Sequence, residues 1–263
     1  MSSQAGSTAS RSFRPRYDVV LLDAGGTLIR VGPGVGEIYA DRAARYGVEV
    51  EPKVIEAQFR ALWDERHDTL HGGVSDTVER QWWHGLVSDV FDRAGKRGTF
   101  GDAFDPYFEE LYDLFSLGDV WHVFDDVVPA LEALEANGIR CAVVSNWDSR
   151  LGQLLDRLGL GRWFEFVFTS ATVGYRKPDP RIFGHALAQL GVSAGRAVHV
   201  GDSYEDDVLG AQRAGVTPVL IARDGPPPAG VATLQALTGL PQWLDETADP
   251  TQADPSGSPH RST

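Results

Sequence analysis

The sequence predicts an α/β protein, in which a Rossmann-like, doubly wound parallel sheet forms the core and an all-helical cap domain is inserted into it. Three observations lead to this prediction. Apolar runs without period-2 alternation, such as VVLL at residues 19–22, are typical of strands buried on both faces. After residue 119 such runs alternate with helical patterns, which favours parallel strands joined by helices. Residues 38–117, by contrast, show only helical spacing of apolar residues.

These patterns divide the chain into a core, a cap and two tails. We assign residues 17–31 and 119–245 to the core and residues 32–118 to the helical cap, which resembles an insertion because the core pattern resumes after it. Residues 1–16 are rich in Ser and Arg, and residues 246–263 are polar and rich in Pro. Both tails are predicted to be disordered, since neither offers apolar residues that could pack.

The individual elements follow from the same periodicities. Four cap helices are predicted in the segments 37–47, 53–70, 77–95 and 102–115, each with apolar residues three and four positions apart. The core is expected to begin with a strand at 16–23 and to continue through four helix–strand pairs: 128–138 with 140–146, 149–161 with 164–170, 179–191 with 197–202, and 206–215 with 217–222.

Composition excludes several classes of partner and site. With 37 acidic and 24 basic residues the formal net charge is −13, so the chain repels nucleic acids and anionic membrane surfaces. The single cysteine, Cys141, excludes an intramolecular disulfide and a cysteine-based zinc cluster. No run approaches the length of a membrane span. We therefore expect a cytoplasmic monomer or dimer that acts on a small molecule and binds neither nucleic acid nor membrane.

Polar side chains gather where the predicted core strands end. Asp23, Ser145 and Asp202 each follow such a strand, and Lys177, one of three lysines, precedes a rigid Pro-Asp-Pro turn. The carboxyl ends of parallel strands meet at one edge of a sheet, where ligands of such sheets bind. Taken singly, each residue could be a helix cap or a turn residue. Together they predict a site where carboxylates hold an ammonium group and a hard cation.

Four segments resemble, in order and spacing, the signature motifs of the haloacid dehalogenase superfamily: DAGGTL, VVSN, RKPDPRIF and VHVGDSYEDDVLGAQRAG. The helical insertion between the first two is similar to the C1-type cap of that superfamily. Cap stretches such as VEPKVIEAQFRALW and RQWW are most similar to the rhythmically-expressed-gene branch of its hydrolases. The resemblance covers nearly the whole chain except the two tails and implies a phosphatase-like hydrolase.

The resemblance also implies roles for individual residues. Asp23 would be the nucleophile that forms an aspartyl intermediate, with Ser145 and Lys177 as its catalytic partners. Mg²⁺ would be the cofactor, and the outer acidic ligand would be Asp207 in preference to Asp206. The implied phosphate-binding residues are Gly26, Thr27, Ser145, Asn146 and Lys177, and the implied Mg²⁺ ligands are Asp23, Gly25 through its carbonyl, Asp202 and Asp207.

The first motif departs from the phosphatase pattern at one catalytic position. Phosphatases that the chain resembles usually have DxDxT there, and the second Asp acts as general acid and base; this chain has Gly25 instead. A general acid–base group typically contributes about 10²–10⁴-fold in rate. The substitution leaves three functions open. The first, which we favour, is a Mg²⁺-dependent phosphatase suited to leaving groups that need little protonation.

The other two functions explain the missing Asp differently. In a 2-haloacid dehalogenase the halide departs without a proton, although the many carboxylates of GDSYEDD are of no use to a metal-free halide site. In a binding or regulatory protein the phosphate pocket would be retained without turnover. His67, His71, His84 and Asp148 are candidates to replace the missing acid. Cap aromatics that could contact substrate or simply form the cap core are Trp63, Trp82, Trp83, Tyr107 and Tyr112.

Overall fold

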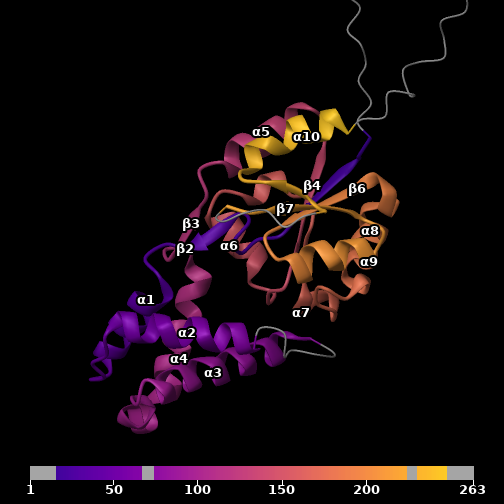
Figure 1. The fold of residues 1–263 in the computed structure, drawn as a ribbon. Helices are drawn as coiled ribbons and strands as arrows, with labels where there is room; N and C mark the ends of the chain where they lie inside the picture. The colour runs from indigo at the N-terminus through magenta and orange to yellow at the C-terminus, as the bar shows by residue number, and fades with distance from the viewer. Residues whose placement is uncertain (1–15, 67–73, 224–229, 248–263) are drawn as a thin grey trace, which may run out of the picture.

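A parallel sheet of six strands forms the centre of the core (Figure 1). The computed structural model describes residues 16–66, 74–223 and 230–247; most of the two predicted tails, residues 1–15 and 248–263, therefore lies outside the described residues. The strand order is β5-β4-β1-β6-β7-β8. The strands are β1 (Val19–Leu22), β4 (Arg140–Ser145), β5 (Val167–Thr169), β6 (Ala197–Gly201), β7 (Thr217–Ile221) and β8 (Ala232–Leu234).

Helices cover both faces of this sheet, as the unbroken apolar runs of its strands require. Every residue of the central strands β1 and β6 is buried. One face packs against α5 (Val127–Ala136), α6 (Leu151–Arg157) and α10 (Leu240–Glu246), and the other against α8 (Pro180–Leu190) and α9 (Gly210–Arg213) (Figure 1). Cys141 is buried in the first of these packing layers. The predicted doubly wound α/β core is confirmed.

Four helices form the cap, which has a hydrophobic core of its own. They are α1 (Val35–Arg45), α2 (Pro52–Arg66), α3 (Asp76–Arg93) and α4 (Phe104–Leu117), and a 3₁₀ segment at Arg97–Ala103 precedes α4. Aromatic rings fill much of the cap core: the Tyr107 ring lies 4.7 Å from Phe100 and 5.3 Å from Phe91. Tyr107 also donates a hydrogen bond to the Tyr39 carbonyl. It is therefore a cap-core residue.

A short antiparallel ribbon lies where the chain leaves and re-enters the core. It pairs β2 (Ile29–Val31) with β3 (Trp121–Val123), which are separated by the whole cap in sequence. These strands are not evident from the sequence, because three residues are too few to show a period. The edge strand β8 and the helix α10 were not predicted either.

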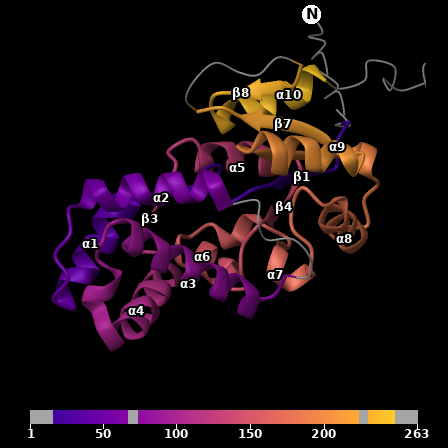
Figure 2. The ribbon, with the colours of Figure 1, turned by 60° about the horizontal axis from the view of Figure 1, so that its bottom comes forward.

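The cap folds back onto the carboxyl edge of the sheet. Helix α3 contacts the short helix α7 (Ser170–Val173), and α4 contacts α6, so that the cap lies alongside the core (Figure 2). Polar contacts hold the two parts together: Ser149 donates to Asp76, and the buried Ser170 hydroxyl donates to Glu79. In the part of the chain that the structure describes, no helix has the length and apolarity needed to cross a membrane.

Candidate active site

The turn that follows β1 carries the first candidate residue, Asp23. The Asp23 amide donates to the Val200 carbonyl at 2.9 Å, which ties the turn to β6. Three residues later the backbone enters the left-handed region, with φ 73° at Gly26. A Cβ at Gly26 would also lie 2.1 Å from an Asp202 carboxylate oxygen. Glycine is thus needed at this position both for its backbone conformation and for the close approach of Asp202.

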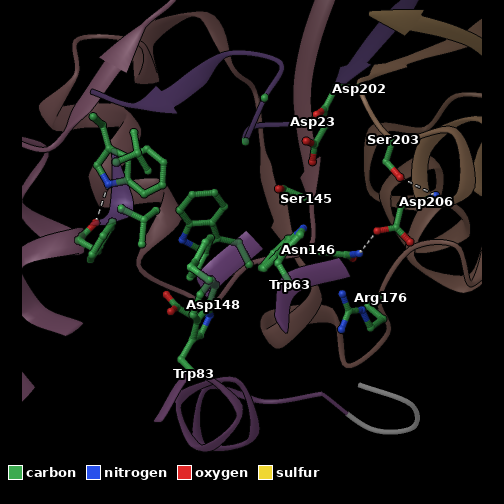
Figure 3. Close-up of a pocket in the computed structure, with 18 of the residues that line it drawn as sticks. Asp23, Trp63, Trp83, Ser145, Asn146, Asp148, Arg176, Asp202, Ser203 and Asp206 are labelled. Atoms are coloured by element: carbon green, nitrogen blue, oxygen red, sulfur yellow. Dashed lines mark hydrogen bonds between the residues drawn. The ribbon is translucent and has the colours of Figure 1, made fainter. Parts of the chain in front are cut away.

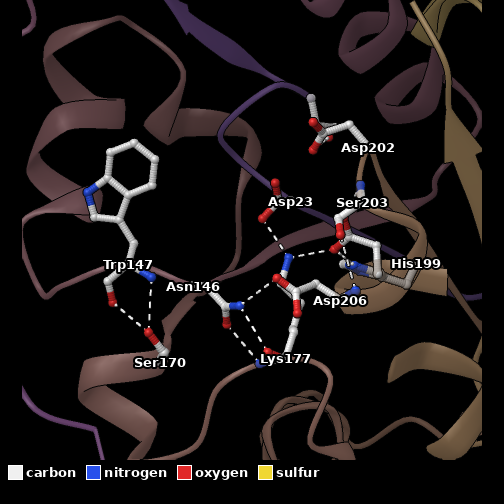
Figure 4. A network of polar contacts seen from close by, with 11 residues as sticks. Asp23, Asn146, Trp147, Ser170, Lys177, His199, Asp202, Ser203 and Asp206 are labelled. Carbon is white, nitrogen blue, oxygen red and sulfur yellow. Dashed lines mark hydrogen bonds and ion pairs between the residues drawn. The ribbon is translucent and has the colours of Figure 1, made fainter. Parts of the chain in front are cut away.

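Lys177 reaches the same place from the loop before α8. Asp179 caps α8 by accepting from the Arg181 amide, and Pro180 occupies the first turn, as the sequence predicts. The Lys177 ammonium lies 2.6 Å from Asp23 Oδ1 and 2.6 Å from Asp207 Oδ1 (Figure 4). It is only 2% exposed. A buried ammonium thus joins the two carboxylates that the sequence assigns to one site.

Asn146 fixes the backbone of this lysine loop. Its side-chain amide donates to the Lys177 carbonyl at 3.0 Å, and its Oδ1 accepts from the Lys177 amide at 2.7 Å. One side chain thus pairs with both backbone polar groups of Lys177, as a neighbouring β-strand would. Asn146 is predicted to bind phosphate; in the structure its side chain positions Lys177 and also donates to Asp206.

His199 is a site residue that the sequence analysis missed. It lies in β6, is fully buried, and its Nε2 is 2.8 Å from Asp207 Oδ1. The second oxygen of Asp207 accepts from the Ser203 amide at 2.9 Å. Both oxygens of Asp207 are therefore engaged. The sequence does contain a signal for it, since His199 is the one polar residue in the apolar strand AVHVG. A buried polar side chain requires a hydrogen-bond partner, which would have pointed to a nearby carboxylate.

Burial and mutual charge give these groups unequal proton affinities. Burial raises the pKa of Asp23 more than Lys177 lowers it. Although burial acts in the opposite direction, the charge of Lys177 and the bond from His199 hold the pKa of Asp207 below its ordinary value. Lys177 itself has a raised pKa, because Asp207 and Asp23 outweigh its burial, so it stays charged. Asp207 therefore holds its negative charge more readily than Asp23 does.

Asp202 completes a group of three carboxylates. One oxygen each from Asp23, Asp202 and Asp207 lies within 4.8 Å of the others. Asp202 is the exposed member; reduced hydration of its carboxylate and the charges of Asp23 and Asp207 raise its pKa to about 7. Three carboxylates at this spacing are the oxygen ligands that a hard divalent cation prefers. The residues present fit Mg²⁺, with Gly25 on the adjoining turn.

Asp206 has surroundings different from those of Asp207. Its Oδ2 accepts from Asn146 Nδ2 at 3.1 Å, and burial raises its pKa to about 6. Because Asp207 shares Lys177 with Asp23, the geometry groups Asp207, and not Asp206, with Asp23 and Asp202. This grouping supports the preference for Asp207 as the outer acidic residue.

Two further predicted residues approach the carboxylates from neighbouring strands and turns. Ser145 ends β4 and is 2% exposed, and its hydroxyl lies beside the Asp23 carboxylate, where it favours the ionised form. It also lines the cavity described below. Thr27 is fully buried, and its Oγ1 donates to Asp202 Oδ1 at 3.5 Å. Ser145 can therefore contact a group bound at Asp23. Thr27 instead orients the Asp202 carboxylate through its hydrogen bond.

A cavity of about 550 Å³ lies between the cap and these residues (Figure 3). Its floor includes Asp23, Ser145 and Lys177, and its cap wall is largely aromatic. Of the five cap aromatics singled out from the sequence, Trp63, Trp83 and Tyr112 line it, whereas Trp82 packs against the cap core. Such a cavity, apolar with a few convergent polar groups, is typical of a small-molecule site.

Trp147 lies against the position where the phosphatase pattern has its second Asp. A Cβ at Gly25 would be 3.4 Å from Trp147 Cζ3, so the indole borders the space into which a longer side chain would extend. Trp147 is anchored by bonds to the Ser170 hydroxyl and by its contact with the Trp121 ring at 5.2 Å. Figure 4 shows the indole and the lysine cluster on different sides of Asp23. The absence of a side chain at Gly25 therefore leaves room for the Trp147 indole.

The described candidates for a replacement acid are engaged elsewhere. His84 pairs with Asp105 at 3.0 Å and packs against the Phe108 ring, and it is not itself a lining residue of the cavity. Asp148 lines the cavity, but Arg150 and the Tyr112 hydroxyl both donate to it. Although burial opposes them, the Arg150 bonds hold the pKa of Asp148 below its ordinary value, so it is a poor proton donor. The other two candidates, His67 and His71, lie outside the described residues.

Known proteins are similar to this chain in both sequence and fold. Residues 17–215 match the haloacid dehalogenase-like hydrolase family. The chain is 39% identical over 217 residues to haloacid dehalogenase-like hydrolase domain-containing protein 3 of Mus musculus, covering 82% of this chain and 86% of that protein. It is 25% identical over 210 residues to the rhythmically expressed gene 2 protein of Drosophila melanogaster, covering 76% and 81%.

Two solved structures show the same architecture with different named activities. A HAD phosphatase from Thermococcus onnurineus superposes with a TM-score of 0.61 at 26% identity, covering 86% of this chain and 97% of that one. A 2-haloacid dehalogenase from Pseudomonas syringae superposes with a TM-score of 0.60 at 27% identity, covering 88% and 100%. The resemblance drawn from the four motifs is confirmed: the chain belongs to the haloacid dehalogenase-like hydrolase family.

Proposed function

We propose that this hydrolase is a Mg²⁺-dependent phosphatase that acts on a small phosphorylated metabolite through an aspartyl-phosphate intermediate on Asp23. The observation that carries the proposal is the cluster at the carboxyl edge of the sheet, where Asp23 is held by Lys177 beside Asp202 and Asp207. A carboxylate nucleophile with cationic and hydrogen-bonding neighbours suits phosphoryl transfer, which depends on positioning and on stabilisation of negative charge.

Each residue of the cluster has a defined part in this proposal. The Asp23 carboxylate attacks phosphorus, and the bond from phosphorus to the leaving oxygen breaks. Lys177 and the Ser145 hydroxyl bind the phosphoryl oxygens, while Asn146 keeps the lysine loop in place. Mg²⁺, when bound by Asp23, Asp202, Asp207 and the Gly25 carbonyl, supplies positive charge that offsets the phosphoryl oxygens. Water then hydrolyses the aspartyl phosphate and frees Asp23.

Gly25 sets the range of substrates that we propose. Of the described candidates for a replacement acid, Asp148 is held as an anion and His84 does not line the cavity. Leaving groups that depart as stable anions, such as aryl and acyl phosphates, need little protonation. Alkyl phosphates need more, so we expect them to react more slowly by about 10²–10⁴-fold, the usual contribution of such a group.

A 2-haloacid dehalogenase is the second candidate, because Gly25 and the similarity to a solved dehalogenase both favour it. Halide leaves without a proton, so the missing Asp would cost nothing. The three clustered carboxylates weigh against this candidate, since they repel one another unless a cation joins them. The presence of Asp23, Lys177 and Asp202 together weighs against a binding protein without turnover.

The test is phosphate release from aryl, acyl and alkyl phosphates, with and without Mg²⁺, by the wild type and by Asp23→Asn. We expect Mg²⁺-dependent release that is fastest on aryl and acyl phosphates and is lost in Asp23→Asn. Chloride release from 2-chloropropionate without Mg²⁺ would instead establish the dehalogenase. If Mg²⁺ binds and no substrate class turns over, the chain is a binding protein.

A further inference from the structure

Arg176 lines the cavity from the core side and takes no part in the site described so far. It lies in the loop between α7 and α8, one residue before Lys177. Figure 3 shows its side chain next to those of Asn146 and Asp206, at the edge of the cavity. The loop that delivers the ammonium to Asp23 therefore also delivers a guanidinium to the same cavity.

The guanidinium of Arg176 is incompletely paired. Its Nη1 is buried and has no hydrogen-bond partner among the described residues. A buried donor that loses water without gaining an acceptor costs free energy, so each such group requires an explanation. Arg150 lines the same cavity, and its guanidinium donates to Asp148 and to the Tyr112 carbonyl. Arg150 thus has its acceptors within the protein, whereas Arg176 lacks one.

Nearby carboxylates do not supply the missing acceptor. Asp206 and Glu79 both lie close enough for the positive charge of Arg176 to act on them. Asp206 accepts from Asn146, and Glu79 accepts from Ser170. Within residues 16–66, 74–223 and 230–247, neither forms an ion pair with Arg176. Arg176 therefore lines the cavity with a guanidinium that keeps one donor without an acceptor among these residues.

We propose that Arg176 binds a second anionic group of the substrate, a carboxylate or a second phosphate, while the reacting phosphoryl group lies at Asp23. This inference rests on the proposed function and narrows its substrate class to phosphate esters that carry another acidic group. The planar guanidinium presents N–H donors in a fork that matches the oxygens of a carboxylate or phosphate. Arg176 is then a specificity residue. The spacing between its guanidinium and the Lys177 ammonium sets the length of the substrate that binds.

The test measures binding rather than turnover. Isothermal titration calorimetry with Mg²⁺ compares ω-phosphonocarboxylates of increasing chain length with alkylphosphonates of the same length, and a parallel series of bisphosphonates distinguishes a carboxylate from a second phosphate. The variants are Arg176→Met, Arg176→Lys and the matched control Arg181→Met. Arg181 is an exposed arginine at the start of α8, paired with Asp179.

In the wild type we expect one chain length to bind at least about tenfold more tightly with the second anion than without it, equivalent to about 1.4 kcal/mol. Arg176→Met should remove this preference, Arg176→Lys should keep part of it, and Arg181→Met should keep all of it. Phosphonate binding without any preference, or a preference that survives Arg176→Met, overturns the inference and leaves the phosphatase proposal intact. If no phosphonate binds, the proposed function fails, and the inference that rests on it fails too.

Discussion

The ammonium of Lys177 lies 2.6 Å from the carboxylate of Asp23, a residue 154 positions earlier in the chain. The pair is almost completely buried, and Asp207 shares the same ammonium. Two carboxylates at this depth are tolerated because one cation lies between them. The same contact that orients the proposed nucleophile therefore also compensates the charges of the folded core.

Lys177→Met should destabilise the protein as well as inactivate it. Removing one partner of a buried ion pair typically costs about 3–5 kcal/mol, because the remaining charge is left uncompensated. Urea unfolding in the presence of EDTA measures this loss. Lys53→Met is the matched control, since Lys53 is exposed on α2. Equal unfolding free energies for the two variants would show that the buried pair does not stabilise the fold.

Gly25→Asp alone should restore little activity on alkyl phosphates, because Trp147 borders the space that the new carboxylate needs. Gly25→Asp combined with Trp147→Ala should raise kcat/KM on alkyl phosphates by more than about tenfold, as part of the roughly 10²–10⁴-fold that a general acid usually contributes. Rates for both single variants and the double variant give the coupling between the two positions. Full recovery in Gly25→Asp alone would contradict the assigned role of Trp147.

Glu79→Gln should stabilise the protein more at pH 8 than at pH 5. Burial raises the pKa of Glu79, which lies near Arg176, Asp148 and Asp76 and accepts a bond from Ser170. A raised folded-state pKa means that stability is lost as pH rises and the carboxyl ionises. Glutamine keeps the acceptor without that ionisation. The measurement is the Tm of each protein at both pH values.

Two results bear on that prediction. Glu79→Ala is the control, because it lacks the acceptor for Ser170 and should be destabilised at both pH values. A Tm difference between the Gln variant and the wild type that shrinks from pH 5 to pH 8 would mean that the carboxylate is stabilising and the assigned pKa direction is wrong.

Mg²⁺ should bind more tightly at pH 8 than at pH 6. The pKa of Asp202 is raised to about 7, so at the lower pH a proton occupies the carboxylate that the cation needs. The rise in Tm on adding Mg²⁺ reports this affinity. Asp202→Asn should reduce the rise and remove this part of its pH dependence. Equal rises in the wild type at both pH values would exclude Asp202 as a ligand that must lose a proton.

Local chemistry explains which parts of this molecule can be predicted from sequence. The apolar run of β1 ending in Asp23, and the Asp179–Pro180 start of α8, each specify their own backbone, so the Lys177–Asp23 contact follows from strand order. The fit between Gly25 and Trp147 depends on packing between separate segments, and no local pattern encodes it. The unpaired Nη1 of Arg176 likewise depends on its surroundings in the fold.

Capture of the covalent intermediate tests the central claim most directly. Wild type and Asp23→Asn are mixed with radiolabelled acetyl phosphate and Mg²⁺, quenched in acid, and digested for peptide mapping. We predict a hydroxylamine-sensitive label on the peptide that contains Asp23, formed only with Mg²⁺ and lost in Asp23→Asn. A label that persists in Asp23→Asn, or steady phosphate release with no label at any quench time, would contradict the account.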